Sequence, residues 1–91
     1  MKKSMRFFIT GSVQPIFFNR FIKDSADELG VKGFVRKLAD GRMEIFAEGD
    51  SDAVEKMSEV CNKGPPHSFI RSVDEKEEKF QDLKDFRIIS F

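Results

Sequence analysis

The chain has 91 residues, and its 16 basic and 16 acidic side chains give a formal net charge of zero. This length suits a single domain over residues 1–91, and the lack of a basic excess argues against a general binder of nucleic acid or membrane surfaces. A lone cysteine, Cys61, excludes an intrachain disulfide, and Cys61 with the single His67 cannot complete a zinc site. We therefore expect no metal.

The first residues, MKKSMRFFIT, contain an apolar patch interrupted by Arg6. The patch is too short for the core of a signal peptide or for a membrane span. We expect a cytoplasmic, monomeric protein that uses no cofactor and binds neither membranes nor nucleic acid. The sequence does not identify a protein partner.

Two elements are predicted in the first third of the chain. Residues 5–13, MRFFITGSV, alternate in polarity, which predicts a strand with one buried face. Apolar side chains then recur at helical spacing up to Leu29, and Gly30 follows as a residue that commonly ends helices. This second pattern predicts a helix over residues 19–29.

The middle of the chain contains a hairpin signal. Asp40 and Gly41 both tolerate positive φ, and they lie between two apolar-rich runs. A later stretch of helical periodicity ends at Gly64, and two prolines prevent the helix from resuming. We predict strands at 32–38 and 42–48, a helix at 51–62, and strands at 68–73 and 85–91.

The predicted order is strand, helix, strand, strand, helix, strand, with a short last strand. This is the split βαβ pattern, and it predicts a ferredoxin-like α/β sandwich in which an antiparallel sheet carries both helices on one face. The charged run 74–82 is expected to be an exposed strand end or loop. Most of the eleven phenylalanines are expected in the core.

RNA-recognition domains share this layout, and Lys32-Gly33-Phe34 matches the start of one of their motifs. The match ends after three residues, because Arg36 and Lys37 stand where apolar and aromatic residues should follow. Since the net charge is also zero, RNA binding is the least favoured of the functions considered.

Three motifs resemble those of a known family. Residues 11–21 read GSVQPIFFNRF, residues 33–49 read GFVRKLADGRMEIFAEG, and residues 64–66 read GPP. In this order and at this spacing, the chain resembles the acylphosphatase family along nearly its whole length. The resemblance implies a ferredoxin-like fold and hydrolysis of carboxyl–phosphate bonds without a metal or a covalent intermediate.

The resemblance also implies a loop of backbone N–H groups that holds phosphate between the first strand and the first helix. It implies an arginine at position 19 that binds the phosphate, and an asparagine at position 37 that orients the attacking water. The loop would consist of Gln14, Pro15, Ile16, Phe17 and Phe18.

This chain departs from the family pattern at three of these positions. Asn19 replaces the arginine and carries no charge, and Lys37 replaces the asparagine and cannot accept a hydrogen bond. Pro15 replaces a glycine, has no N–H, and favours an extended Gln14. The loop is therefore expected to change shape.

Two functional hypotheses follow. In the first, the domain is a degenerate acylphosphatase that acts as a binding or interaction module. Little or no hydrolysis is expected in this case, because the loss of one oxyanion donor typically lowers the rate by about 10²–10³. In the second, it hydrolyses small acyl phosphates, with Arg20 or Lys37 supplying the positive charge. Either hypothesis allows a phosphate or acyl-phosphate ligand. Arg20 could reach the site only with an extra loop residue or a helix rotated by about 100°.

The stretch Ile16-Phe17-Phe18 is apolar where it enters the helix. The simpler expectation is that one or two of these side chains pack beneath the loop, since large apolar residues are usually buried. The alternative is an exposed apolar lip that binds an acyl group or a partner.

Overall fold

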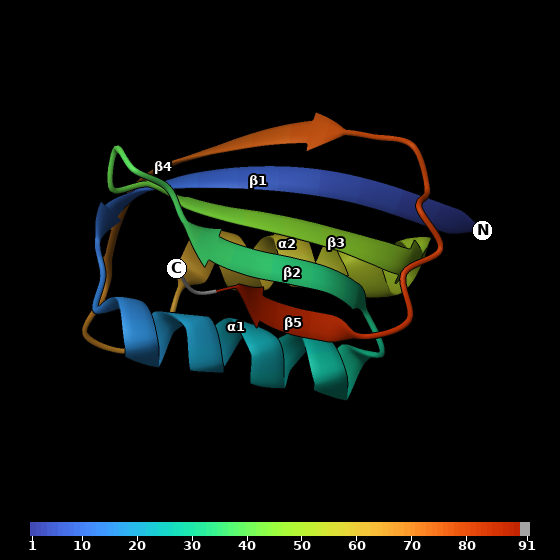
Figure 1. Ribbon diagram of the computed structural model, residues 1–91, viewed down its shortest axis with the longest axis horizontal. Coiled ribbons are helices and arrows are strands. Elements are labelled where there is room, and N and C mark those ends of the chain that lie inside the picture. The colour runs from blue at the N-terminus through green and yellow to red at the C-terminus, as the bar shows by residue number, and fades with distance from the viewer. Residues whose placement is uncertain (90–91) are drawn as a thin grey trace.

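The alternating segment at the start of the chain forms a strand inside a five-stranded sheet, between two other strands. The computed structural model describes residues 1–89. Both helices lie on one face of the sheet (Figure 1). The elements are β1 (Lys2–Ser12), α1 (Pro15–Leu29), β2 (Lys32–Lys37), β3 (Met43–Asp50), α2 (Ser51–Lys63), β4 (Phe69–Glu77) and β5 (Phe86–Ile89).

The strand order is β4-β1-β3-β2-β5, and the first four strands are antiparallel to their neighbours. This confirms the ferredoxin-like sandwich. The fifth strand corrects the prediction of a wholly antiparallel sheet, because β5 pairs with β2 in parallel. After β4 the chain turns back along one end of the sheet (Figure 1), so β5 runs opposite to β4 and therefore in the direction of β2.

Several boundaries differ from the prediction. Helix α1 begins at Pro15 rather than at residue 19, because the fixed φ of proline suits the first position of a helix. Strand β4 continues to Glu77, because its charged residues lie at a solvent-exposed edge and still pair with β1. The predicted hairpin is confirmed: Gly41 has φ of 92° and its N–H donates to the Leu38 carbonyl at 3.0 Å. Residues 90–91 of the predicted last strand lie outside the described residues.

The core lies between the sheet and the two helices. Alternate residues of β1, β2 and β3 face inward, and the buried stripes of α1 and α2 pack against them. The cluster consists of Phe7, Ile9, Phe18, Ile22, Ala26, Val31, Val35, Met43, Ile45, Ala47, Met57, Cys61 and Phe86.

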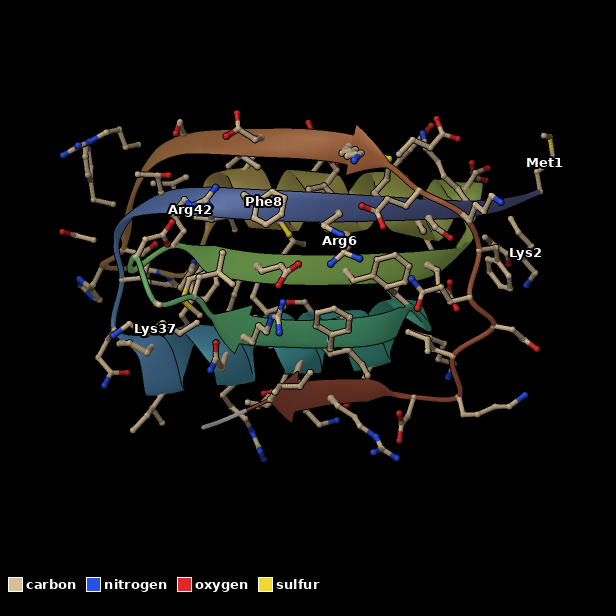
Figure 2. All side chains as sticks on the ribbon, turned by 45° about the horizontal axis from the view of Figure 1, so that its top comes forward. Met1, Lys2, Arg6, Phe8, Lys37 and Arg42 are labelled. Carbon is tan, nitrogen blue, oxygen red and sulfur yellow. The ribbon has the colours of Figure 1, made fainter. Side chains whose placement is uncertain are left out.

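Ion pairs cross the opposite face of the sheet, which carries no helix (Figure 2). Arg6 binds Glu78 through two hydrogen bonds of 2.7 and 2.9 Å, and it also pairs with Glu44. Glu44 accepts a further hydrogen bond from Arg36. The Arg6 guanidinium lies 5.2 Å from the ring centroid of Phe46, which adds a cation–π contact. These contacts tie β1, β2, β3 and Glu78, the residue that follows β4, together.

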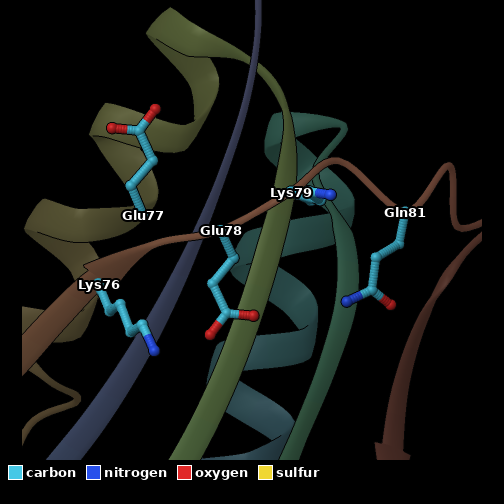
Figure 3. A pocket seen from close by; sticks show the side chains of 5 residues that line it. All are labelled: Lys76, Glu77, Glu78, Lys79 and Gln81. Atoms are coloured by element: carbon cyan, nitrogen blue, oxygen red, sulfur yellow. The ribbon is translucent and has the colours of Figure 1, made fainter.

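The connection between β4 and β5 is held by the buried carboxylate of Glu48 on β3. Glu48 accepts hydrogen bonds from the backbone N–H groups of Gln81, at 2.7 Å, and Leu83, at 2.6 Å. In Figure 3 the strand alternation extends into this connection, since Lys76 and Glu78 point to one side and Glu77 to the other. Glu48 therefore fixes the path that leads the chain to β5.

Removal of the Glu48 carboxylate is expected to destabilise the domain. Because two backbone donors would lose a charged acceptor, Glu48→Ala should lower the free energy of unfolding by about 2–4 kcal/mol. Urea denaturation measures this change. The exposed Glu59 on α2 provides the control, since Glu59→Ala should change the free energy by less than about 0.5 kcal/mol. Equal effects of the two substitutions would contradict the role of Glu48.

The Arg6–Glu78 pair predicts a pH dependence of stability. The hydrogen bond from Arg6 lowers the pKa of Glu78 in the folded state. The pair therefore stabilises the fold above the unfolded pKa of about 4.3, and this contribution is lost as pH falls through the lowered folded pKa.

Replacing Glu78 by glutamine should make the loss of stability between about pH 5 and pH 3 less steep. Urea denaturation at a series of pH values tests this expectation, with Glu55→Gln on the exposed face of α2 as the control. If Glu78→Gln leaves the slope of unfolding free energy against pH unchanged, the pair does not contribute as described.

Candidate functional site

The topology brings the end of β2 close to the start of α1. Strands β1 and β2 both pair antiparallel with β3, so they run in the same direction, and β1 leads into α1 where β2 ends. On β2, Val35 faces the helices and is fully buried. Lys37 lies two residues further along and therefore faces the same side. Figure 2 shows Lys37 at the end of the molecule where α1 begins.

A pocket of about 500 Å³ lies between these two segments. It contains four of the predicted site residues, Pro15, Ile16, Asn19 and Lys37. Asn19 and Lys37 are its two polar side chains, and the others are apolar. Its lining residues are Pro15, Ile16, Asn19, Lys37, Leu38, Ala39 and Ile89.

A neighbouring hollow of about 650 Å³ shares Pro15 and Lys37 with this pocket. Gln14 and His67 are among its other lining residues. Within residues 1–89, no carboxylate forms an ion pair with Lys37. Among the described residues, the positive charge of the Lys37 ammonium is therefore uncompensated. It lies at the boundary of both hollows.

Asn19 lies on the buried face of α1, and only 9% of its surface is exposed. Its Oδ1 atom is buried and has no hydrogen-bond partner among the described residues. A buried polar atom without a partner typically costs about 1–3 kcal/mol. Among the described residues, no partner offsets the cost of burying this oxygen at the pocket.

Arg20 lies outside both hollows, on the solvent side of α1. Its side chain is 71% exposed and pairs with Asp24 at 3.6 Å. The reason is the helix itself, since one residue along α1 rotates the side-chain direction by about 100°. Of the two candidates for the positive charge, Lys37 is thus the one that lines the pocket.

The predicted phosphate loop has become the first turn of α1. Gln14 is extended, with φ of −87° and ψ of 113°, as expected before a proline. It serves as the N-cap residue: its side-chain Oε1 accepts the N–H of Phe17 at 2.6 Å, and its backbone carbonyl accepts the N–H of Phe18 at 2.8 Å. Because Pro15 has no N–H, only the amide of Ile16 remains for a ligand in this turn.

The three apolar residues of the first turn have different environments. Phe18 is 1% exposed and packs in the core, which fits the expectation that one or two of them are buried. Ile16 and Phe17 are 80% and 50% exposed. These two side chains form the apolar lip that the alternative interpretation predicted, and Ile16 also lines the pocket.

Other features of the described residues offer no comparable site. The hollow beside β4, which Figure 3 shows, has mixed charge, and the Glu78 carboxylate at its edge is already bound by Arg6. Within residues 1–89, no group of three or more metal-ligating side chains is assembled, and no helix is long and apolar enough to cross a membrane. Cys61 is buried, and this burial raises the pKa of its thiol far above the usual value.

Three residues of the pocket wall were not predicted. Leu38 and Ala39 follow Lys37 in the hairpin, so their proximity could have been inferred from the chain order. Ile89 comes from β5, and no local signal links it to the start of α1. Its place in the wall depends on the parallel pairing of β5 with β2.

Comparisons with known proteins agree with this fold. The sequence model of the acylphosphatase family matches residues 5–88. The chain is 41% identical to an acylphosphatase of Rubrobacter xylanophilus, in a match that covers 84% of this chain and 69% of that protein. It is 35% identical to an acylphosphatase of Alkalilimnicola ehrlichii, in a match that covers 98% of this chain and 100% of that protein. The crystal structure of acylphosphatase from Bacillus subtilis superposes with a TM-score of 0.90 at 30% identity, covering 99% of this chain and all of the other.

The unpartnered oxygen of Asn19 predicts an unusual response to substitution. Asn19→Leu replaces the amide with an apolar side chain of similar size, and it should raise the free energy of unfolding by about 1–2 kcal/mol. Urea denaturation measures the change, and Arg20→Leu on the exposed face is the control, with an expected effect below about 0.5 kcal/mol. A loss of stability in Asn19→Leu would show that the buried amide is satisfied in the folded protein.

Proposed function

The chain belongs to the acylphosphatase family, and from this premise we propose that it hydrolyses the carboxyl–phosphate bond of small acyl phosphates, with Lys37 supplying the positive charge. The observation that carries the proposal is that Lys37 lines the pocket at the start of α1, together with Asn19. The relatives named above support hydrolysis rather than a module that has lost it.

The chemistry needs a cation because the phosphoryl group is an anion whose charge is redistributed as the bond breaks. The Lys37 ammonium can hold this group and stabilise the developing charge in a pocket with apolar walls. An ammonium is a point charge and does not bind phosphate through two parallel hydrogen bonds as a guanidinium does. We therefore expect slow turnover, at least about 100-fold below that of the Bacillus subtilis acylphosphatase in the same assay.

The apolar side chains at the pocket suit the other half of the substrate. Leu38, Ala39 and Ile89 form part of the wall, and Ile16 extends it to the exposed lip. An acyl group with an aromatic or branched apolar body would bury its surface against these residues. Benzoyl phosphate is therefore a suitable test substrate.

A second candidate function is binding of a phosphate-bearing ligand without hydrolysis. The observation that favours it is the first turn of α1, where Gln14 accepts the N–H groups of Phe17 and Phe18 and Pro15 has none. Fewer backbone donors then remain to stabilise a transition state. In this case the domain would act as an interaction module through the pocket and the lip formed by Ile16 and Phe17.

Hydrolysis of benzoyl phosphate distinguishes the two candidates. The proposal predicts turnover above the spontaneous rate, and Lys37→Met should lower kcat/KM by about 100-fold or more because the charge is removed. Arg20→Ala is the control and should stay within about twofold, since Arg20 lies on the solvent side of α1.

The outcome against the proposal is equally specific. If the protein has the second function, hydrolysis is no faster in its presence than in buffer alone. Its amide NMR signals at residues 12–20 and 37 nevertheless shift on addition of inorganic phosphate. Turnover that persists unchanged in Lys37→Met would remove Lys37 from the proposed site.

A further inference from the structure

The buried amide of Asn19 has no assigned role in the proposed hydrolysis. We propose that Asn19 orients the water that attacks phosphorus, while Lys37 holds the phosphoryl group on the same side of the pocket. This inference rests on the proposed function, because it names the second polar group of the same reaction. It follows from three observations: the shared pocket, the burial of Asn19 and the missing partner of its Oδ1 atom.

The first step of the argument concerns hydrogen-bonding capacity. An attacking water must donate one of its protons to an acceptor so that a lone pair points at phosphorus. Lys37 has donors only and cannot fulfil this role. The remaining side chains of the described pocket wall are apolar, so the Asn19 amide is the one side chain there that both accepts and donates.

The second step concerns the environment of the amide. Oδ1 is buried without a partner, and a half-turn about the last side-chain bond exchanges Oδ1 with Nδ2. We infer that this rotation offers the acceptor to the pocket, because Asn19 lines the pocket and α1 does not need to move. In the complex with substrate, a water held there would satisfy the amide oxygen, and the neighbouring apolar residues would strengthen the hydrogen bond by lowering the local dielectric.

The reaction balances with these two residues. The water oxygen forms a bond to phosphorus, and the bond between phosphorus and the bridging carboxyl oxygen breaks, so that its electron pair leaves with the carboxylate. One water proton passes to a non-bridging phosphoryl oxygen, which gives dihydrogen phosphate. Lys37 stays protonated and the Asn19 amide gains no proton, because neither acts as a base.

The arrangement also accounts for two substitutions at once. The family resemblance implies a cation at position 19 and an amide at position 37, and this chain has the amide at 19 and the cation at 37. Both positions line one pocket here, so the exchange leaves one cation and one amide facing the same space.

The test separates kcat from KM in hydrolysis of benzoyl phosphate. Asn19→Leu should lower kcat by about 100-fold and leave KM within about threefold, because it removes water positioning without removing the charge. Lys37→Met should instead raise KM and the inhibition constant of inorganic phosphate. Arg20→Leu is the matched control, because it introduces leucine at the neighbouring position on the exposed face of α1. It should leave kcat and KM unchanged.

Reciprocal exchange provides the second measurement. Asn19→Arg leaves two cations and no amide, Lys37→Asn leaves two amides and no cation, and each should lower kcat/KM at least tenfold. The double variant restores one of each, in the arrangement that the family resemblance implies, and should recover to within about tenfold of the parent. Recovery supports the need for one cation and one amide in this pocket, while the effect of Asn19→Leu on kcat tests the water-positioning role.

The outcomes separate the inference from the function on which it rests. If the parent protein shows no turnover, the proposed function and this inference are both wrong. A parent with turnover whose kcat is unchanged by Asn19→Leu keeps the function and overturns the inference. If both single variants lower kcat/KM and the double variant does not recover, the inference is also overturned.

Discussion

Pro15 controls how the chain passes from the central sheet into its first helix. Its fixed φ suits the first helical position, so only residues 13 and 14 separate β1 from α1. Gln14 then closes the turn with its side chain and its carbonyl. In this turn Pro15 has no N–H and the N–H groups of Phe17 and Phe18 are bound by Gln14, so one backbone amide, that of Ile16, remains for an anion. The polar side chains of the pocket are Asn19 and Lys37.

The interactions that stabilise the sheet lie away from this pocket. Arg6, Glu44 and Glu78 join strands on the face without helices, and Glu48 holds the connection to β5. These contacts do not involve the start of α1. The scaffold can therefore keep the family fold while the residues at the pocket vary, which is how a chain with substituted site positions still superposes closely on the Bacillus subtilis acylphosphatase.

The pocket combines an exposed cation, a buried amide and apolar walls. The cation attracts a phosphoryl group, the amide is costly to bury unless it gains a partner, and the walls favour an apolar acyl group. Each property alone has an ordinary structural explanation. In the proposed mechanism, their combination at the end of β2 and the start of α1 gives the substitutions at positions 19 and 37 a part in one reaction.

The sequence by itself determined the order of the elements, the hairpin at Gly41, the family and the poor fit of Pro15 to an amide-lined loop. These features depend on periodicity, turn chemistry and motifs, which neighbouring residues encode. Only the tertiary structure decided that Arg20 faces solvent, that the Asn19 oxygen is left without a partner among the described residues, that Ile89 reaches the pocket, and that Phe17, Phe69 and Phe80 are exposed. The physical reason is that burial and pocket walls arise from contacts between segments far apart in the chain, and local patterns do not specify those contacts.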